Sequence, residues 1–190
     1  MELESYTPVN IVVGRFQPLT NGHIKCINDT FKNTGLTTIL VIVNTDETRI
    51  STYNPFPTEM LIDMYMNICM SHPHIEGFVI TSNADIVKNT EKLKEYGYIT
   101  AAWTCGEDRY DSYKKMVQNY YEKSFITDDF TLYCIPRNKN DISATSVRND
   151  ILNNNYNNFI NKTPFNILPK KMGRRYFNIM HEQISKINNK

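Results

Sequence analysis

Short apolar runs alternate with amphipathic segments along most of the chain. The first run, Val9 to Val13, is rich in β-branched residues and is followed by Gly14, a pattern that predicts a buried strand ending at a turn. Comparable runs predict further strands at residues 39–43, 78–80, 99–103 and 130–135.

Segments with apolar residues at helical spacing separate these runs. After the first strand, Ile24, Ile27 and Phe31 recur three or four residues apart, as on the buried face of a helix. The other predicted helices are a segment opened by Pro57 and Thr58, residues 87–96, residues 110–121, a segment from about Thr145, and residues 170–187.

Strands that alternate with helices in units of about 30 residues form a parallel sheet with helices on both faces. We therefore predict an α/β fold, a doubly wound (Rossmann-like) parallel five-stranded sheet with a C-terminal helical appendage. Beyond Ile151 the composition changes, because residues 153–161 are rich in asparagine; this stretch is a polar loop or a short helix. We place the α/β core at residues 1–152 and a helical segment packed on it at residues 153–190.

The charge balance argues against a protein that binds polyanions by bulk attraction. The chain has 21 Lys and Arg against 20 Asp and Glu, a net charge of +1, whereas nucleic-acid binders usually carry a basic excess. We expect no nucleic-acid partner, and we expect any bound anion to be held by a few local groups.

The cysteines and the apolar runs indicate the compartment. Four unevenly spaced cysteines form no Cys-x-x-Cys pair or disulfide framework, which favours reduced thiols. The first residues are acidic rather than apolar, and no run approaches the roughly 20 apolar residues that span a bilayer. We expect a soluble cytoplasmic protein without a membrane partner.

The loop after the first strand carries groups that suit an anion. Gly14 permits a tight turn, and Gly22 leaves the free amides at the start of the next helix open to a phosphate. Thr20 offers a hydroxyl, His23 a ring N–H, and Arg15 a forked cationic donor. The alternative is an ordinary strand–turn–helix junction with a histidine at the helix start.

A second cluster, Ile142 to Arg148, follows the fifth predicted strand and a loop. Ser143 or Thr145 could cap the next helix, and Arg148 lies one turn beyond Thr145 on the same face. These groups could hold phosphate oxygens, or they could form an ordinary capped helix.

A third cluster follows the fourth predicted strand. Gly106 could bring backbone amides close to a nucleoside, and Asp108 could accept from ribose hydroxyls. The alternative is an acidic helix cap, with Asp108 or Asp111 at the helix start. Because ligands of open α/β sheets bind beyond the carboxyl ends of the strands, we expect all three clusters to face one crevice.

The first two clusters together resemble a known pair of motifs. Thr-x-Gly-His at 20–23 and Ile-Ser-x-Thr-x-x-Arg at 142–148 are similar to the paired motifs of the nucleotidyltransferase α/β-phosphodiesterase superfamily, in matching order from about Val9 to Ile151. Within that superfamily, Gly-Arg-Phe-Gln-Pro at 14–18 and Tyr-Asn-Pro-Phe-Pro-Thr-Glu at 53–59 look most like archaeal-type nicotinamide mononucleotide adenylyltransferases.

The resemblance implies roles for residues of the clusters. Arg15 and His23 would contact the phosphates of ATP, Arg148 the triphosphate, and Phe16 would lie near the nucleotide. The catalytic group implied is His23, Arg15, Thr20 and Arg148. The ATP-binding set implied is Gly14, Arg15, Phe16, Gln17, Thr20, Gly22, His23, Gly106, Asp108, Ile142, Ser143, Thr145 and Arg148.

The resemblance also bears on the residues that would bind the acceptor. Asn54, Asn89 and Trp103 are the candidates for acceptor binding, but Lys92 stands where the archaeal enzymes have the Trp of an Asn-x-x-Trp segment. Trp103 is either a replacement stacking surface or a core residue. Thr20 stands where most relatives have histidine, as it does in pantetheine-phosphate adenylyltransferases.

The implied reaction is transfer of AMP from ATP to nicotinamide mononucleotide, forming NAD and pyrophosphate. The alternatives are adenylyl or cytidylyl transfer to phosphopantetheine, FMN, nicotinate mononucleotide or another phosphorylated acceptor, and a module that senses NAD or ATP without turnover. Mg²⁺ would enter on the ATP phosphates, with no metal site in the protein itself. Relatives of this kind are commonly homo-oligomers, so we expect a homo-oligomer.

Overall fold

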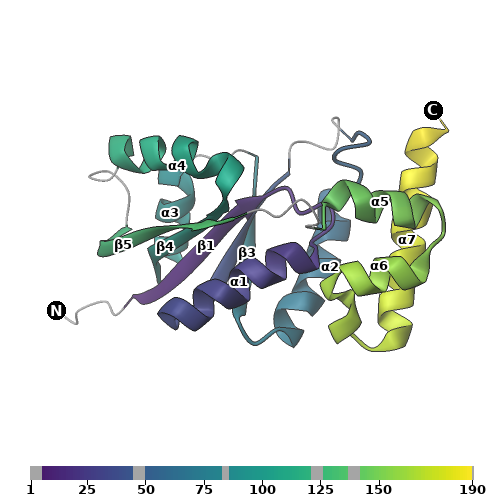
Figure 1. The fold of residues 1–190 in the computed structure, drawn as a ribbon, viewed down its shortest axis with the longest axis horizontal. Helices are drawn as coiled ribbons and strands as arrows, with labels where there is room; N and C mark the ends of the chain where they lie inside the picture. The colour runs from purple at the N-terminus through teal and green to yellow at the C-terminus, as the bar shows by residue number, and fades with distance from the viewer. Residues whose placement is uncertain (1–5, 45–49, 83–85, 121–125, 137–141, 190) are drawn as a thin grey trace.

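A computed structural model describes residues 6–44, 50–82, 86–120, 126–136 and 142–189. Five parallel strands form one sheet in the order β3-β2-β1-β4-β5 (Figure 1). The strands are β1 (Thr7–Gly14), β2 (Thr38–Val43), β3 (Ile75–Thr81), β4 (Tyr98–Gly106) and β5 (Ile126–Ile135). This arrangement confirms the predicted doubly wound α/β class.

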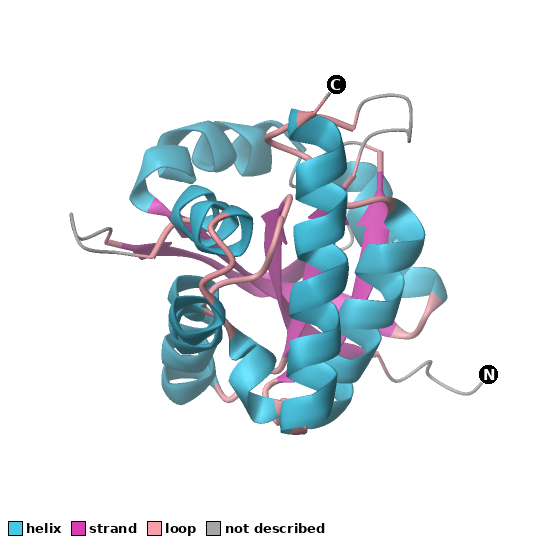
Figure 2. Ribbon diagram, turned by 90° about the vertical axis from the view of Figure 1, so that its right-hand side faces the viewer, coloured by secondary structure: helices cyan, strands magenta, loops and turns pink. Residues whose placement is uncertain are grey.

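Helices cover both faces of the sheet (Figure 2). They are α1 (Asn21–Thr34), α2 (Thr58–Ser71), α3 (Ile86–Glu95), α4 (Glu107–Tyr120), α5 (Ala144–Leu152), α6 (Tyr156–Lys162), the 3-10 helix η3 (Pro164–Ile167) and α7 (Lys170–Asn188). Among the helices in the described part of the chain, none combines the length and the apolar character that a membrane-crossing helix needs.

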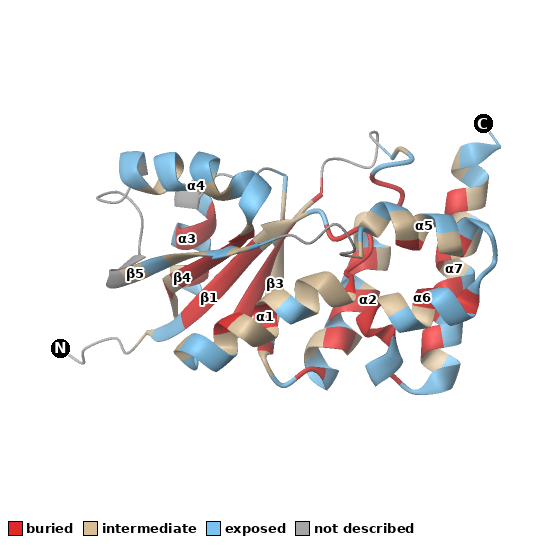
Figure 3. Ribbon diagram, viewed as in Figure 1, coloured by how far each residue is buried: buried red, intermediate tan, exposed pale blue. Residues whose placement is uncertain are grey.

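Two apolar clusters pack on opposite faces of the sheet, and their fully buried residues are among the positions coloured as buried in Figure 3. On one face, strand residues such as Leu40 and Ile42 pack with α1, α2 and the C-terminal helices. On the other face, Val9, Ile11 and Trp103 pack with α3 and α4. The β-branched runs are therefore buried on both sides, as expected of central parallel strands.

The C-terminal helices belong to the same apolar cluster as the sheet. Phe159 of α6 and Phe177 of α7 are fully buried in it, and burial of each such ring contributes about 1.5–3 kcal/mol. The asparagine-rich stretch is a short helix rather than a loop: Asn155 caps it by accepting from the N–H of Asn158, and Tyr156 and Phe159 bury its apolar face. The boundary predicted after residue 152 falls in the turn between α5 and α6.

Candidate functional site

The carboxyl ends of the central strands lie at one edge of the sheet. Val12 of β1 is in register with Thr104 of β4, and Gly106 at the end of β4 is in register with Ile135 of β5. The chain leaves β1 toward β2 on one side and later returns to β4 on the other. This reversal of direction is the place where open α/β sheets bind ligands.

The two main clusters meet at this edge. The Thr20 hydroxyl donates to the carbonyl oxygen of Ile142 at 3.5 Å, and the same oxygen lies 3.4 Å from where a Cβ on Gly22 would be. The Arg148 guanidinium donates to the carbonyl oxygen of Gln17 at 2.7 Å. Residues more than a hundred positions apart in sequence thus form the wall of one site.

Thr20 orients the His23 ring. The backbone N–H of Thr20 donates to Nδ1 of His23 at 3.1 Å, and Thr20 Oγ1 lies 2.9 Å from the same atom. Because a backbone N–H can only donate, Nδ1 must accept, and the neutral ring therefore carries its proton on Nε2. Thr20 is fully buried, and with Nδ1 as an acceptor its single hydroxyl proton is shared between Nδ1 of His23 at 2.9 Å and the Ile142 carbonyl at 3.5 Å.

The Arg148 guanidinium is partly buried at this site, and the exposed Arg15 is near enough to act on it electrostatically. The pKa of Arg148 is lowered, first because half-burial removes water from its charge and second because Arg15 repels it; Tyr53 acts in the opposite direction. Among the described residues, no carboxylate forms an ion pair with either arginine. Two neighbouring cations without a carboxylate partner form a site that a polyanion would stabilise.

The α5 segment is a capped helix that also presents a cation. Ser143 is the N-cap, and its Oγ accepts from the N–H of Ser146 at 3.1 Å, which decides between the two capping residues considered from the sequence. Thr145 accepts from the second arm of the Arg148 guanidinium at 2.9 Å. Thr145 and Gln17 thus hold the two arms of one side chain.

Gln17 clasps the loop that precedes α2. Its Oε1 accepts from the N–H of Phe56 at 2.8 Å, and its Nε2 donates to the Phe56 carbonyl at 3.3 Å and to Asn44 at 3.4 Å. The side chain is 1% exposed. Gln17 therefore faces the predicted ATP site through its backbone carbonyl, and its side chain holds the loop in place.

Phe16 has a constrained backbone. Its φ of 46° lies in the left-handed region, where a non-glycine residue costs of order 1–3 kcal/mol unless its surroundings hold it. The ring is 3% exposed and meets the His23 ring edge-on, with centroids 5.1 Å apart. Phe16 supports the position of His23, and its ring does not present an open face to a ligand.

The three predicted acceptor residues are all buried. Asn54 donates to Asn44 at 2.8 Å and leaves its own Oδ1 buried without a partner, and Nδ2 of Asn89 is likewise buried without one. Trp103 is fully buried and stacks on Tyr113, with centroids 4.1 Å apart. For Trp103 the structure replaces the predicted stacking role with core packing, because α4 covers the ring.

The third cluster lies at the same sheet edge. Gly106 ends β4 and α4 begins at Glu107, so Asp108 lies in the first turn of the helix rather than at its cap. Asp108 is exposed and pairs with Arg109 at 3.7 Å. Its contact with a ribose stays a prediction.

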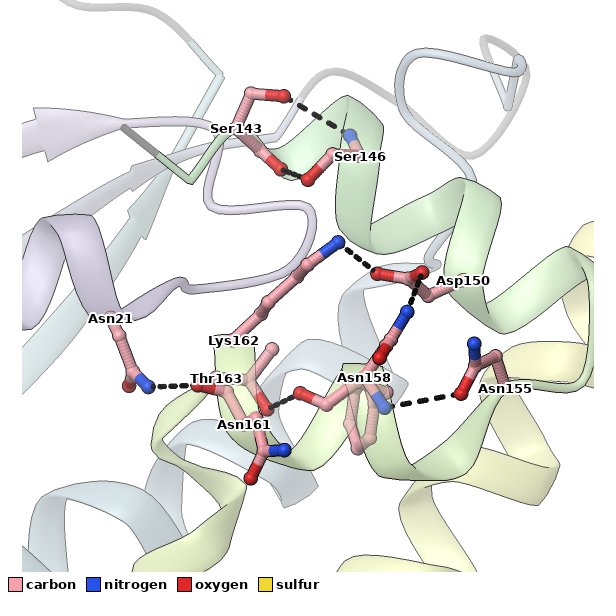
Figure 4. A network of polar contacts seen from close by, with 10 residues as sticks. Asn21, Ser143, Ser146, Asp150, Asn155, Asn158, Asn161, Lys162 and Thr163 are labelled. Atoms are coloured by element: carbon pink, nitrogen blue, oxygen red, sulfur yellow. Dashed lines mark hydrogen bonds and ion pairs between the residues drawn. The ribbon is translucent and has the colours of Figure 1, made fainter. Parts of the chain in front are cut away.

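Helix α6 braces the two helices that begin at the site (Figure 4). Asn21, the first residue of α1, donates to the carbonyl of Asn161 at 2.9 Å. Asp150 of α5 pairs with Lys162 at 2.6 Å and accepts from Asn158 at 3.2 Å. The asparagine-rich segment thus connects α1 to α5.

Sequence reasoning missed two residues that shape the site. Asn44, at the end of β2, joins Gln17, Asn54 and Thr58 in one hydrogen-bond network. Tyr65 of α2 bonds to the backbone of the loop after β1. A signal for Tyr65 existed: it is a phenol on the buried stripe of α2, and a buried tyrosine hydroxyl usually has a hydrogen-bond partner.

The packing of Phe16 leads to a stability prediction. A Cβ on Gly14 would lie 3.0 Å and 3.1 Å from two atoms of the Phe16 ring, so Gly14→Ala must displace a buried ring. We expect Gly14→Ala to lower the free energy of unfolding by about 1–3 kcal/mol, measured by urea denaturation. The matched control is Gly77→Ala, whose Cβ would meet nothing within 4 Å; equal unfolding energies for the two variants would contradict the packing argument.

Comparisons with known proteins agree with this architecture. The family model described as cytidylyltransferase-like matches residues 11–150. No curated protein sequence matches the chain. Among solved structures, nicotinic acid mononucleotide adenylyltransferase from Plasmodium falciparum, complexed with NaAD, has a TM-score of 0.60 and 14% identity, covering 94% of this chain and 98% of that one.

A second solved structure is a bifunctional NMN adenylyltransferase/ADP ribose pyrophosphatase from Francisella tularensis, with a TM-score of 0.54 and 19% identity. It covers 97% of this chain and 54% of that one. At these identities the likeness shows a shared fold. The family model, by contrast, spans most of the chain and both clusters that meet at the sheet edge. The chain therefore belongs to the cytidylyltransferase-like family of the nucleotidyltransferase superfamily.

Proposed function

We propose that the chain is an adenylyltransferase that transfers AMP from ATP to a pyridine mononucleotide, with nicotinamide mononucleotide as the first candidate. Family membership supports nucleotidyl transfer, and the two structures compared above are named for nicotinic acid mononucleotide and NMN adenylyl transfer. The resemblance of residues 14–18 and 53–59 to the archaeal type supports nicotinamide mononucleotide.

The observation that carries the proposal is the meeting of the loop after β1 with the start of α5, where Thr20 contacts the Ile142 carbonyl and Arg148 binds the Gln17 carbonyl. The pKa of Arg148 is lowered first by burial and second by Arg15, and no described carboxylate pairs with either arginine. A triphosphate supplies the missing negative charge, and Arg148 already has its two arms oriented by Gln17 and Thr145.

The chemistry is an in-line displacement. A phosphate oxygen of the acceptor forms a bond to the α-phosphorus of ATP, and the bond from that phosphorus to the bridging oxygen breaks, releasing pyrophosphate. The acceptor phosphate is already anionic near neutral pH, so no general base is needed. Catalysis comes from alignment of the two anions and from compensation of the charge that grows on the leaving group.

Each group has a part in this step. His23 donates from Nε2 to a phosphate oxygen, because Thr20 occupies Nδ1. Arg15 and Arg148 compensate the charge of the leaving pyrophosphate. The amides at the starts of α1 and α5 add partial positive charge. Mg²⁺ enters with ATP as the MgATP complex, as is usual for phosphoryl-transfer substrates.

The test is pyrophosphate release from MgATP with each acceptor supplied separately. Release with nicotinamide mononucleotide supports the proposal in full. Preferential release with nicotinate mononucleotide, phosphopantetheine or FMN would show that the proposed acceptor is wrong. Preferential use of CTP would show that the proposed nucleotide donor is wrong. Silence across the panel, with ATP or NAD still bound in calorimetry, would favour the sensing module instead.

His23 gives a second test. We expect His23→Ala to lower kcat by roughly 10²- to 10³-fold, the scale of a lost transition-state donor, with much less change in the free energy of unfolding. The control is His181→Ala in α7, whose ring stacks on Phe177 at 6.4 Å in the C-terminal helices. Turnover by His23→Ala within a few-fold of the unsubstituted protein would remove His23 from the mechanism.

A further inference from the structure

One phenol holds the loop that carries Arg15 and leads to His23. The hydroxyl of Tyr65, in α2, donates to the carbonyl of Phe16 and accepts from the N–H of Leu19 at 2.9 Å. It reaches this loop across 46 and 49 residues of sequence. From α2, Tyr65 thereby fixes the backbone of the segment between Arg15 and His23 at both Phe16 and Leu19.

The backbone between Phe16 and Leu19 requires contacts from outside the loop to keep its conformation. Phe16 has a left-handed backbone, a conformation that a residue with a side chain keeps only when its neighbours enforce it. Two constraints act on Phe16: its ring is packed against His23, and its carbonyl is bound by Tyr65. The second constraint acts directly on the peptide unit that joins Phe16 to Gln17.

The hydroxyl keeps its proton. Burial raises the pKa of Tyr65, and the hydrogen bond from Leu19 opposes this rise without cancelling it. The side chain is fully buried. Its donor to Phe16 is therefore present at any pH at which the protein is assayed.

The polar groups of the proposed site connect to this segment. Arg15 precedes Phe16, Thr20 follows Leu19 and orients His23, and the Gln17 carbonyl accepts from Arg148. The peptide between Phe16 and Gln17 carries the Phe16 carbonyl, and its orientation is set by ψ of Phe16 and φ of Gln17. A change in these angles would alter how Arg15 and the Gln17 carbonyl lie relative to each other. Tyr65 is therefore linked through the backbone to Arg15, His23 and Arg148, although it does not itself contact the proposed ligand.

We propose that Tyr65 is a positioning residue, which aligns Arg15, His23 and Arg148 on the polyphosphate by fixing the backbone between Phe16 and Leu19. This inference rests on the proposed function for its kinetic consequence. Its binding consequence does not depend on turnover, since the same three groups hold any polyphosphate.

The chain offers a matched control for Tyr65→Phe. Tyr176 is also buried, donates to the carbonyl of Asp63 at 3.1 Å, and accepts from Asn67 at 2.8 Å. Both of its partners lie in α2, the helix that carries Tyr65. Tyr65→Phe and Tyr176→Phe therefore each remove one buried bridging hydroxyl, but only the first touches the loop after β1.

The test compares the two variants at a temperature where circular dichroism shows both folded. We expect Tyr65→Phe to lower kcat for pyrophosphate release at least tenfold with a smaller change in the KM for ATP, and to raise the Kd for inorganic pyrophosphate at least fivefold. Hydrogen exchange in a peptide that contains Leu19 should also be faster. Tyr176→Phe should leave all three measurements within twofold of the unsubstituted protein, despite a similar drop in Tm.

The outcomes separate the two ideas. If the unsubstituted protein releases no pyrophosphate with any acceptor, the proposed function fails, and the pyrophosphate Kd and the Leu19 exchange still decide the role of Tyr65. The positioning role is overturned if Tyr65→Phe keeps both the Kd and the exchange rate of the unsubstituted protein. It is equally overturned if Tyr176→Phe changes them by the same factor, since a general loss of stability would then explain the result.

Discussion

The bond between the Arg148 guanidinium and the backbone carbonyl of Gln17 is the contact on which the site depends. It joins the loop after β1 to the first helix after β5, across 131 residues of sequence. Where it forms, burial and, to a smaller extent, repulsion from Arg15 lower the pKa of Arg148. A bound polyanion would compensate both effects.

Most of the polar side chains around this contact form hydrogen bonds within the protein and keep the backbone of the site in position. The Gln17 side chain accepts a hydrogen bond from the Phe56 N–H, and the Gln17 backbone carbonyl accepts one from Arg148. Thr20 uses its N–H and hydroxyl to orient His23. Helix α6 ties the start of α1 to α5 through Asn161 and Lys162. These contacts set the directions of the His23 ring and the Arg148 guanidinium, which suits a reaction that depends on alignment and electrostatic compensation.

Local patterns carried the sequence predictions that were confirmed. The β-branched runs and the helical spacing predicted a five-stranded parallel sheet, and the Ser143 cap follows from short-range hydrogen bonding that a sequence window contains. The contacts of Gln17 with Asn44 and Phe56, and of Tyr65 with Phe16, could not be predicted in this way, because the partners lie 27 to 49 positions apart in the chain. Trp103 shows the same limit: it ends the strand predicted from the sequence, where a stacking surface is possible, but β4 continues to Gly106 and Tyr113 of α4 covers the ring.

We infer that the loop after β1 and the start of α5 hold one polyphosphate between them. A crystal structure of the protein with Mg²⁺ and a non-hydrolysable ATP analogue would test this arrangement. We expect phosphate oxygens of one triphosphate about 3 Å from both Nε2 of His23 and the guanidinium of Arg148. A triphosphate bound away from the carboxyl ends of β1 and β4, or one that contacts only one of these two residues, would contradict it.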